Sequence, residues 1–268
     1  MAIFAISENR CFLVLYIYIC IYVCVNKLII KEMGQTLCCN NDPCTKSATL
    51  QSNINVKTYT NDANLPHKCS EILKDECIDV HSYCKDKLYD MLYNGILIWD
   101  GKTKYWVDRK TGKNCFMLFA KNLTITDQKD HRKWSWKRSK EDMRSEIAVM
   151  EEVVLLSVYG SFNAELLSAD TKYKVEFVLQ FRKSKNVSGW DKNPVRTILI
   201  PPGKTMKEAI QNKVNLSEIG SEEPFELLAG EFMNSRFIPS GEMQFHLDEK
   251  KEKKTGLVIK GVKITPMI

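Results

Sequence analysis

Residues 104–138 read KYWVDRKTGKNCFMLFAKNLTITDQKDHRKWSWKR, and this stretch decides the fold. Residues 115–120 form a run too apolar to be exposed, which predicts a buried core strand after a turn at residues 110–114. Leu123 and Ile125 then alternate with threonines, the pattern of a second, half-buried strand. The stretch therefore predicts part of a sheet.

A polar loop at residues 127–133 follows the second strand and leads to two tryptophans. Trp134 and Trp136 are two residues apart, so their rings would lie on the same face of an extended chain. Trp134 is our first candidate for an exposed binding platform, although tryptophans beside a strand also serve as core residues. Packing in the core is the expectation for Trp106, Trp136 and Trp190.

Further strands are predicted by the same alternation of apolar and polar residues. In the last segment the apolar parity slips at residues 260–261, so Gly261 is a predicted bulge. Many short strands separated by turns indicate an all-β fold, an antiparallel β-sandwich or barrel. The predicted strands are residues 153–162, 173–182, 196–200, 225–232, 242–247 and 257–264.

The chain before the sheet has a different composition. Pro66 opens a short predicted helix, and a second helix has Cys84, Leu88, Met91 and Leu92 on one stripe and ends at Gly95. The expected parts are an apolar N-terminal segment (1–32), a flexible, Cys-bearing disordered linker (33–65), a helical extension (66–103) and a β-sandwich domain (104–268).

The N-terminal segment allows three interpretations. Residues 11–30 are rich in Ile, Leu, Val and Tyr, which indicates a signal peptide or a membrane anchor, although the run is short for a span. Alternatively, the natural start is Met33 and the preceding residues are an extension. In that case Gly34 is a candidate for myristoylation, and Cys38 and Cys39 are candidates for palmitoylation.

Cysteine use is uneven, because nine of the ten cysteines precede residue 85. No C-x-x-C pair occurs, so a zinc site is not expected. The tenth, Cys115, lies in the predicted core strand and is expected to be a small buried apolar residue. Exposed thiols in a flexible arm would suit intermolecular disulfides, for example in a homodimer, unless a reducing cytosol keeps them free.

The chain lacks the common signatures of catalysis. It contains neither H-E-x-x-H nor G-x-S-x-G, and its four histidines are scattered in the sequence. The Gly101-Lys102-Thr103 tripeptide lacks the earlier glycine of a phosphate-binding loop. We therefore expect a non-enzymatic protein without a metal or cofactor. The formal net charge of +6 is mild and permits contact with RNA without requiring it.

Several short motifs occur in the order found in the phloem protein 2 family of plant phloem lectins, which this chain resembles from about Pro66 to its end. They are YWVD (105–108), CFML (115–118), KNLTIT (121–126), WSW (134–136), GWD (189–191), PV (194–195), GEF (230–232), GE (241–242), GL (256–257), KGV (260–262) and Pro266.

The resemblance implies a jelly-roll-like sandwich with a Nictaba-like lectin domain. It also implies a ligand, an N-acetylglucosamine (chitin) oligomer or an N-glycan, and a place in the cytoplasm of phloem sieve elements and companion cells, with a role in defence. Disulfides between subunits are a further implication. A membrane anchor through residues 11–30 would be the alternative location.

The resemblance also implies a carbohydrate site. The matching acids are Glu242 and Glu249, which as carboxylates could accept hydrogen bonds from sugar hydroxyls, and Trp134 would stack on the sugar. A solvated strand face is the competing interpretation of the two acids. Related sugar-binding proteins have a second tryptophan where this chain has Asp127, and a tyrosine where it has Lys133, so sugar binding would be weakened or redirected.

A function of another class is open as well. The chain would then be a sieve-element structural or RNA-binding protein with a decayed sugar site, cross-linked through its N-terminal cysteines. The basic residues between Arg132 and Arg138, interleaved with tryptophans, have the composition of a single-strand nucleic-acid surface.

Overall fold

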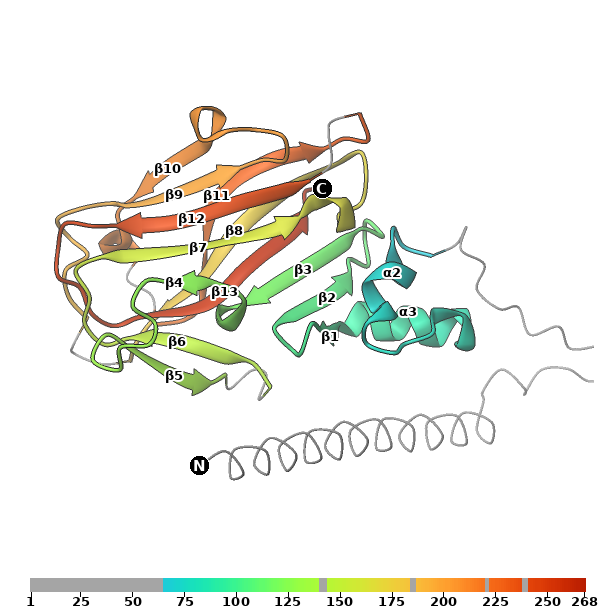
Figure 1. Cartoon of the computed structure of the whole chain (residues 1–268), viewed down its shortest axis with the longest axis horizontal. Helices are drawn as coiled ribbons and strands as arrows, with labels where there is room; N and C mark the ends of the chain where they lie inside the picture. The colour runs from blue at the N-terminus through green and yellow to red at the C-terminus, as the bar shows by residue number, and fades with distance from the viewer. Residues whose placement is uncertain (1–64, 140–143, 184–186, 220–221, 238–240) are drawn as a thin grey trace, which may run out of the picture. The chain divides into compact units, whose positions relative to one another are not determined.

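A computed structural model describes residues 65–139, 144–183, 187–219, 222–237 and 241–268 (Figure 1). In this part of the chain two antiparallel sheets form a β-sandwich, which confirms the predicted all-β class. The apolar segment at residues 1–32, the linker up to residue 64, and the lipidation candidates Gly34, Cys38 and Cys39 lie outside the described residues.

The larger sheet has eight strands, in the order β1-β2-β3-β13-β6-β5, with β8 between β13 and β11. At the register shift between Ile259 and Gly261, β13 contains the bulge predicted at Gly261. A Cβ there would lie 2.0 Å from the carbonyl oxygen of Leu118, so the close approach of β3 requires glycine. The strands are β1 Ile96–Ile98, β2 Thr103–Val107, β3 Asn114–Phe119, β5 Trp134–Arg138, β6 Glu146–Met150, β8 Thr171–Phe181, β11 Phe225–Asn234 and β13 Leu257–Pro266.

The smaller sheet has five strands in the order β10-β9-β12-β7-β4. They are β4 Thr124–Ile125, β7 Leu156–Asn163, β9 Val195–Ile200, β10 Ile210–Val214 and β12 Glu242–Glu249. Short 3-10 turns lie between several strands: η4 Ala120–Asn122, η5 Ala164–Leu166, η6 Met206–Glu208 and η7 Leu216–Glu218. A further one, η3 Val80–Ser82, precedes the first strand.

The core lies between the inward faces of the two sheets. Phe177 of β8 meets Phe245 of β12 edge to face, with ring centroids 6.1 Å apart. Phe116 of β3 packs on Phe162 of β7 at 4.7 Å. These contacts follow from alternation, because every second residue of each strand points inward.

Among the residues described from 65 onward, two short helices precede the sheets, α2 Cys69–Lys74 and α3 Lys85–Asn94. Both lie at one end of the sandwich, where α3 packs beside β2 (Figure 1). As predicted, α3 stops at Gly95, which has a φ of 88°. Leu88 and Leu92 are buried, but Cys84 is the exposed N-cap rather than part of the buried stripe. The first strand, β1, lies in the segment expected to be a helical extension.

Four cysteines lie in the described part of the chain, and all four are free thiols. Cys69 and Cys115 are buried, which confirms the core position predicted for Cys115, whereas Cys77 and Cys84 are exposed. Within the described ranges, no helix combines the length and apolar character that crossing a bilayer requires.

Candidate functional site

The outer face of the five-stranded sheet contains a pocket of about 330 Å³. The antiparallel register of β7 and β12 builds it by placing Tyr159 opposite His246 and Ser161 opposite Gln244. Thr124 of β4 lies opposite Tyr159 on the other side of β7. The lining residues are Asn122, Thr124, Tyr159, Gly160, Ser161, Glu242, Gln244 and His246.

Tyr159 provides the aromatic surface of this pocket. Its side chain is 44% exposed, although it lies in the middle of a strand. The ring stacks with that of His246, with centroids 5.8 Å apart and planes inclined by 21°. An exposed aromatic face supported from one side is a rigid surface for an apolar ligand face.

Polar groups surround this aromatic surface. Ser161 Oγ donates a hydrogen bond to Glu242 Oε1 at 2.6 Å, which holds the exposed carboxylate at the rim. Asn122 is oriented by its own bond, since Nδ2 donates to Thr103 Oγ1 at 2.9 Å. Gln244 is exposed beside them. Hydroxyl, amide and carboxylate groups thus line the same pocket as the ring.

His246 is partly buried in the pocket, and its Nε2 has no hydrogen-bond partner among the described residues. Burial lowers the pKa of its imidazole below the ordinary 6.5, and the charges of Arg196 and Lys250 act in the same direction. Asp248 opposes them by favouring the charged ring, but its carboxylate is engaged by Arg196 at 3.1 and 2.7 Å. The imidazole is therefore neutral at pH 7.

Gly160 allows β7 to lie close to the core beneath the pocket. A Cβ at this position would lie 2.6 Å from Cε2 of Phe245 and 3.0 Å from Cδ2 of Leu123. Such contacts are too short for ordinary packing, so a side chain at residue 160 would displace the strand. Glycine here thus supports the positions of its neighbours Tyr159 and Ser161.

Trp134 does not have the position expected of a sugar platform, and we correct that expectation. Trp134 is the first residue of β5 and has no exposed surface. Its Nε1–H donates a hydrogen bond to the carbonyl oxygen of Thr126 at 3.0 Å. The ring fills the core because β5 directs it inward, so it offers no face to a ligand. Trp136 is partly buried under Lys121, whose Nζ is 3.8 Å from the ring centroid. Trp190 is also buried, as expected.

Asp127, at the position where the resemblance predicts a second tryptophan, is an exposed loop residue. Its φ is 60°, a left-handed conformation that aspartate tolerates better than most residues. Lys133 Nζ contacts its Oδ2 at 2.6 Å, so the two departures from the family pattern are paired with each other. Neither residue lines the pocket.

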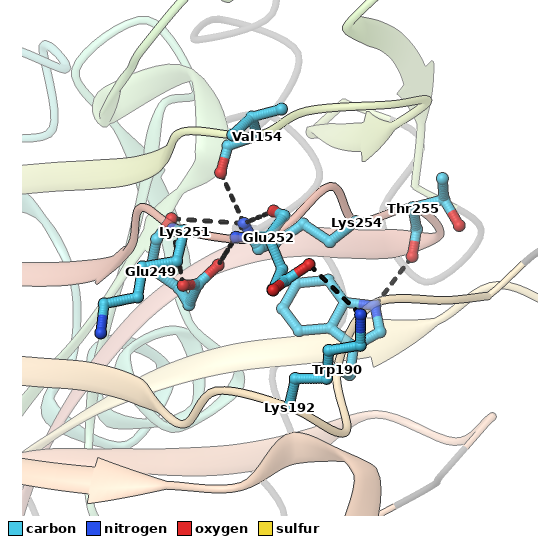
Figure 2. A network of polar contacts seen from close by, with 8 residues as sticks. All are labelled: Val154, Trp190, Lys192, Glu249, Lys251, Glu252, Lys254 and Thr255. Carbon is cyan, nitrogen blue, oxygen red and sulfur yellow. Dashed lines mark hydrogen bonds and ion pairs between the residues drawn. The ribbon is translucent and has the colours of Figure 1, made fainter.

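The expectation that Glu249 binds sugar hydroxyls is also corrected, because its carboxylate is a buried structural group. The residue is 5% exposed and forms an ion pair with Lys254, which has no exposed surface. Figure 2 shows Lys254 Nζ donating to the carbonyl oxygens of Val154, Glu249 and Glu252, while Glu249 accepts from the backbone N–H of Lys251 at 2.8 Å. Its oxygens are therefore engaged inside the protein.

Of the residues predicted from the sequence, only Glu242 lies in the pocket. It begins β12, whereas Glu249 ends the same strand. Sequence reasoning missed Tyr159, Ser161, Gln244 and His246. All four lie at the alternating positions that form the polar faces of two predicted strands, which is the only signal that the sequence gives. Which strands pair with one another is not visible in the sequence.

A second cavity, of about 380 Å³, lies between the 187–191 loop and η7. Its tryptophan, Trp190, is only 4% exposed and donates Nε1 to Thr255 O at 2.9 Å. Because the Trp190 ring is buried in the core, this cavity offers a poorer aromatic surface than the pocket beside Tyr159. In the described ranges, no group of three or more His, Cys, Asp or Glu side chains is arranged to hold a metal ion.

The fold and the pocket define a class: an all-β sandwich with a polar pocket on the outer face of one sheet, where an exposed tyrosine ring stacks on a histidine. The family model described as phloem protein 2 matches residues 113–266. The chain belongs to the phloem protein 2 family, as its motifs predicted.

Two relatives show the extent of the similarity. A protein named lectin from Luffa acutangula is 32% identical over 202 residues, which cover 75% of this chain and 94% of that protein. Protein PHLOEM PROTEIN 2-LIKE A1 of Arabidopsis thaliana is 31% identical over 229 residues, 84% of this chain and 89% of that protein. Among solved structures, the C-terminal CBM6 of LamC from Zobellia galactanivorans aligns with a TM-score of 0.33 at 14% identity, covering 57% of this chain and 99% of that one. That structural likeness is too weak to bear on function.

Proposed function

We propose that the protein is a non-enzymatic lectin that binds N-acetylglucosamine-containing glycans, such as chitin oligomers or N-glycans, in the pocket between β4, β7 and β12. The observation that carries the proposal is that one pocket combines the exposed ring of Tyr159 with the carboxylate of Glu242 and the polar side chains of Ser161 and Gln244. The relative named lectin supports it. Glycans or glycoproteins of the phloem would be the partners, reached in the cytoplasm of sieve elements and companion cells.

The chemistry of a sugar suits this arrangement. A pyranose ring has an apolar C–H face, which would pack on Tyr159, and a rim of hydroxyls, which would donate to Glu242. Gln244 and Asn122 could bond the amide of an N-acetyl group, since each has both a donor and an acceptor. The site thus needs no catalytic group.

The test is calorimetric titration of the full chain with the N-acetylglucosamine trimer. Tyr159→Ala should lower the affinity about fivefold or more, since an aromatic contact contributes about 1 kcal/mol. Glu242→Gln should weaken binding similarly by removing a charged acceptor. Tyr89→Ala is the matched control, a tyrosine on α3 away from the pocket. The proposal fails if the folded wild-type chain binds neither this trimer nor other neutral oligosaccharides.

The alternative, a structural or RNA-binding protein cross-linked through cysteines, has one favourable observation, the exposed thiols of Cys77 and Cys84. Its basic cluster is partly neutralised, because Arg132 is bonded to Asp130 at 2.9 Å, as Lys133 is to Asp127. Salt separates the two functions: RNA affinity should fall steeply as salt rises, whereas sugar affinity should hardly change. Loss of oligomers under reducing agent would support cross-linking.

A further inference from the structure

The buried Nε2 of His246 is a polar atom whose partner is missing from the described part of the protein. Burying such a group without a hydrogen bond is unfavourable, and most buried polar atoms in folded proteins are paired. This atom belongs to a residue that lines the pocket, so a bound ligand can supply the missing partner. The same pocket residues that we assign to sugar binding therefore include one unsatisfied group.

The surroundings of His246 hold the ring in place and keep it uncharged. Tyr159 and Ile198 are its cross-strand neighbours on β7 and β9, and Tyr159 stacks on it. Thr124 lies beyond Tyr159 on β4, and none of these three side chains carries a charge at neutral pH. The ring thus stacks on Tyr159 in uncharged surroundings before a ligand arrives.

The charged groups near the ring lie on its own strand, on β9 and just after β12. Arg196 and Lys250 disfavour the protonated ring, and Asp248 favours it while bonded to Arg196. Glu242 lies further along the same face of β12. Because burial is the largest cause of the lowered pKa, covering the ring with a ligand should disfavour the protonated form still further.

We infer that the neutral imidazole of His246 is the specificity-determining group of this pocket: its Nε2 accepts a hydrogen bond from a hydroxyl or from the N–H of an N-acetyl group of an uncharged saccharide, and protonation, which turns Nε2 into a donor, releases the ligand. This inference rests on the proposed lectin function. Glu242 and the absence of any lysine or arginine among the described lining residues add a second preference, against sugars that carry a carboxylate such as uronic acids.

The linkage has a definite sign. If the ligand binds only the neutral ring, affinity is constant above the pKa of His246 in the free protein. It then falls about tenfold for each further pH unit below that pKa. Since this pKa is lowered from 6.5, the decline should begin below pH 6.5.

The experiment is titration of the full chain with the N-acetylglucosamine trimer between pH 7.5 and pH 5.0. Wild-type affinity should fall as the pH is lowered. His246→Gln keeps a neutral polar group near the Nε2 position and should bind with an affinity that no longer depends on pH. His246→Phe keeps a ring to stack on Tyr159 but should bind weakly at every pH. His131→Gln, at an exposed loop histidine, should retain the full pH dependence.

Two controls keep the outcomes separate. Glu242→Gln should bind more weakly but retain the pH dependence, which excludes the carboxylate as its source. Thermal unfolding of each variant shows that it is folded. A wild-type affinity that stays constant to pH 5.0, or a folded His246→Phe that binds like the wild type, overturns the inference. The lectin function survives in that case if Tyr159→Ala still weakens binding, whereas absence of any saccharide binding overturns both.

Discussion

Lys254 and Glu249 form an ion pair inside the turn that joins β12 to β13, and neither side chain is accessible to ligands. The lysine also bonds the carbonyl oxygen of Val154 at 2.6 Å, which ties this turn to the segment preceding β7. The pair therefore connects the two strands that flank the turn to the start of a third. Full hydrogen bonding is what makes a buried charge pair tolerable.

Replacing Lys254 by Met should destabilise the protein by about 3–5 kcal/mol, because it leaves the carboxylate of Glu249 buried without its counter-charge. Lys253→Met is the matched control. Its pair with Glu152 is exposed, at 62% and 55% of the two side chains, and should contribute no more than about 1 kcal/mol. Urea unfolding measures both. Equal losses in the two variants would contradict the structural role of Lys254.

Acid should weaken this same pair. Burial acts to raise the pKa of Glu249, but the bonds from Lys254 and from the N–H of Lys251 outweigh it, so the pKa lies below the ordinary 4.5. A carboxylate whose pKa is lower in the folded chain than in the unfolded chain stabilises the fold at pH values above its unfolded pKa. This contribution is lost as the pH falls through the folded pKa. The stability difference between wild type and Glu249→Gln should therefore shrink below pH 4.5. A difference that grows on acidification would contradict the assignment.

Trp134 is predicted to act on stability and not on binding. Trp134→Ala should cost about 3–5 kcal/mol, since it leaves a large cavity in the core and frees the carbonyl oxygen of Thr126. Trp134→Phe should be milder, and its sugar affinity should equal that of the wild type once folding is confirmed by circular dichroism. Loss of affinity in folded Trp134→Phe would restore the platform role that the buried ring excludes.

Gly160→Ala should destabilise the sandwich by about 1–3 kcal/mol, because the added methyl group meets the ring of Phe245. Gly241→Ala is the control, since nothing lies within 4 Å of a Cβ at that position, and its effect should stay within about 0.5 kcal/mol. Phe245→Leu combined with Gly160→Ala should cost less than the sum of the two single changes. If the losses in the free energy of unfolding are additive, a methyl group at residue 160 and the ring of Phe245 do not clash.

The four thiols in the described part of the chain should differ in reactivity. Burial raises the pKa of Cys69 to about 11 and that of Cys115 to about 12, which leaves almost no thiolate at pH 8. Alkylation of the native chain, mapped by mass spectrometry, should label Cys77 and Cys84 quickly and the other two only after denaturation. Rapid native labelling of Cys115 would contradict its place in the core.

Local patterns were enough to predict much of the sheet. The apolar run at residues 115–120 became β3, the alternating segments became β7, β8, β11, β12 and β13, and Gly261 is the bulge. The strands β1, β2, β6 and β10 were not predicted, because runs of 3 to 5 residues are too short to show a clear period.

The pocket was much harder to predict. Alternation shows that Tyr159 and His246 lie on the polar faces of their own strands, but it says nothing about which strands pair. Trp134 and Glu249 show the opposite difficulty, because both are residue types suited to a sugar site. In the structure, however, the Trp134 ring is buried in the core and the Glu249 carboxylate is paired with Lys254.

The sequence by itself determined the family, the all-β class and the inward and outward faces of most strands, because these follow from motifs and from a period of two residues. Only the tertiary structure decided which polar residues meet. The pairing of β7 with β12, which are about 80 residues apart, depends on long-range packing of both sheets around one core. That pairing, and not any local signal, brings Tyr159, Glu242 and His246 into one pocket.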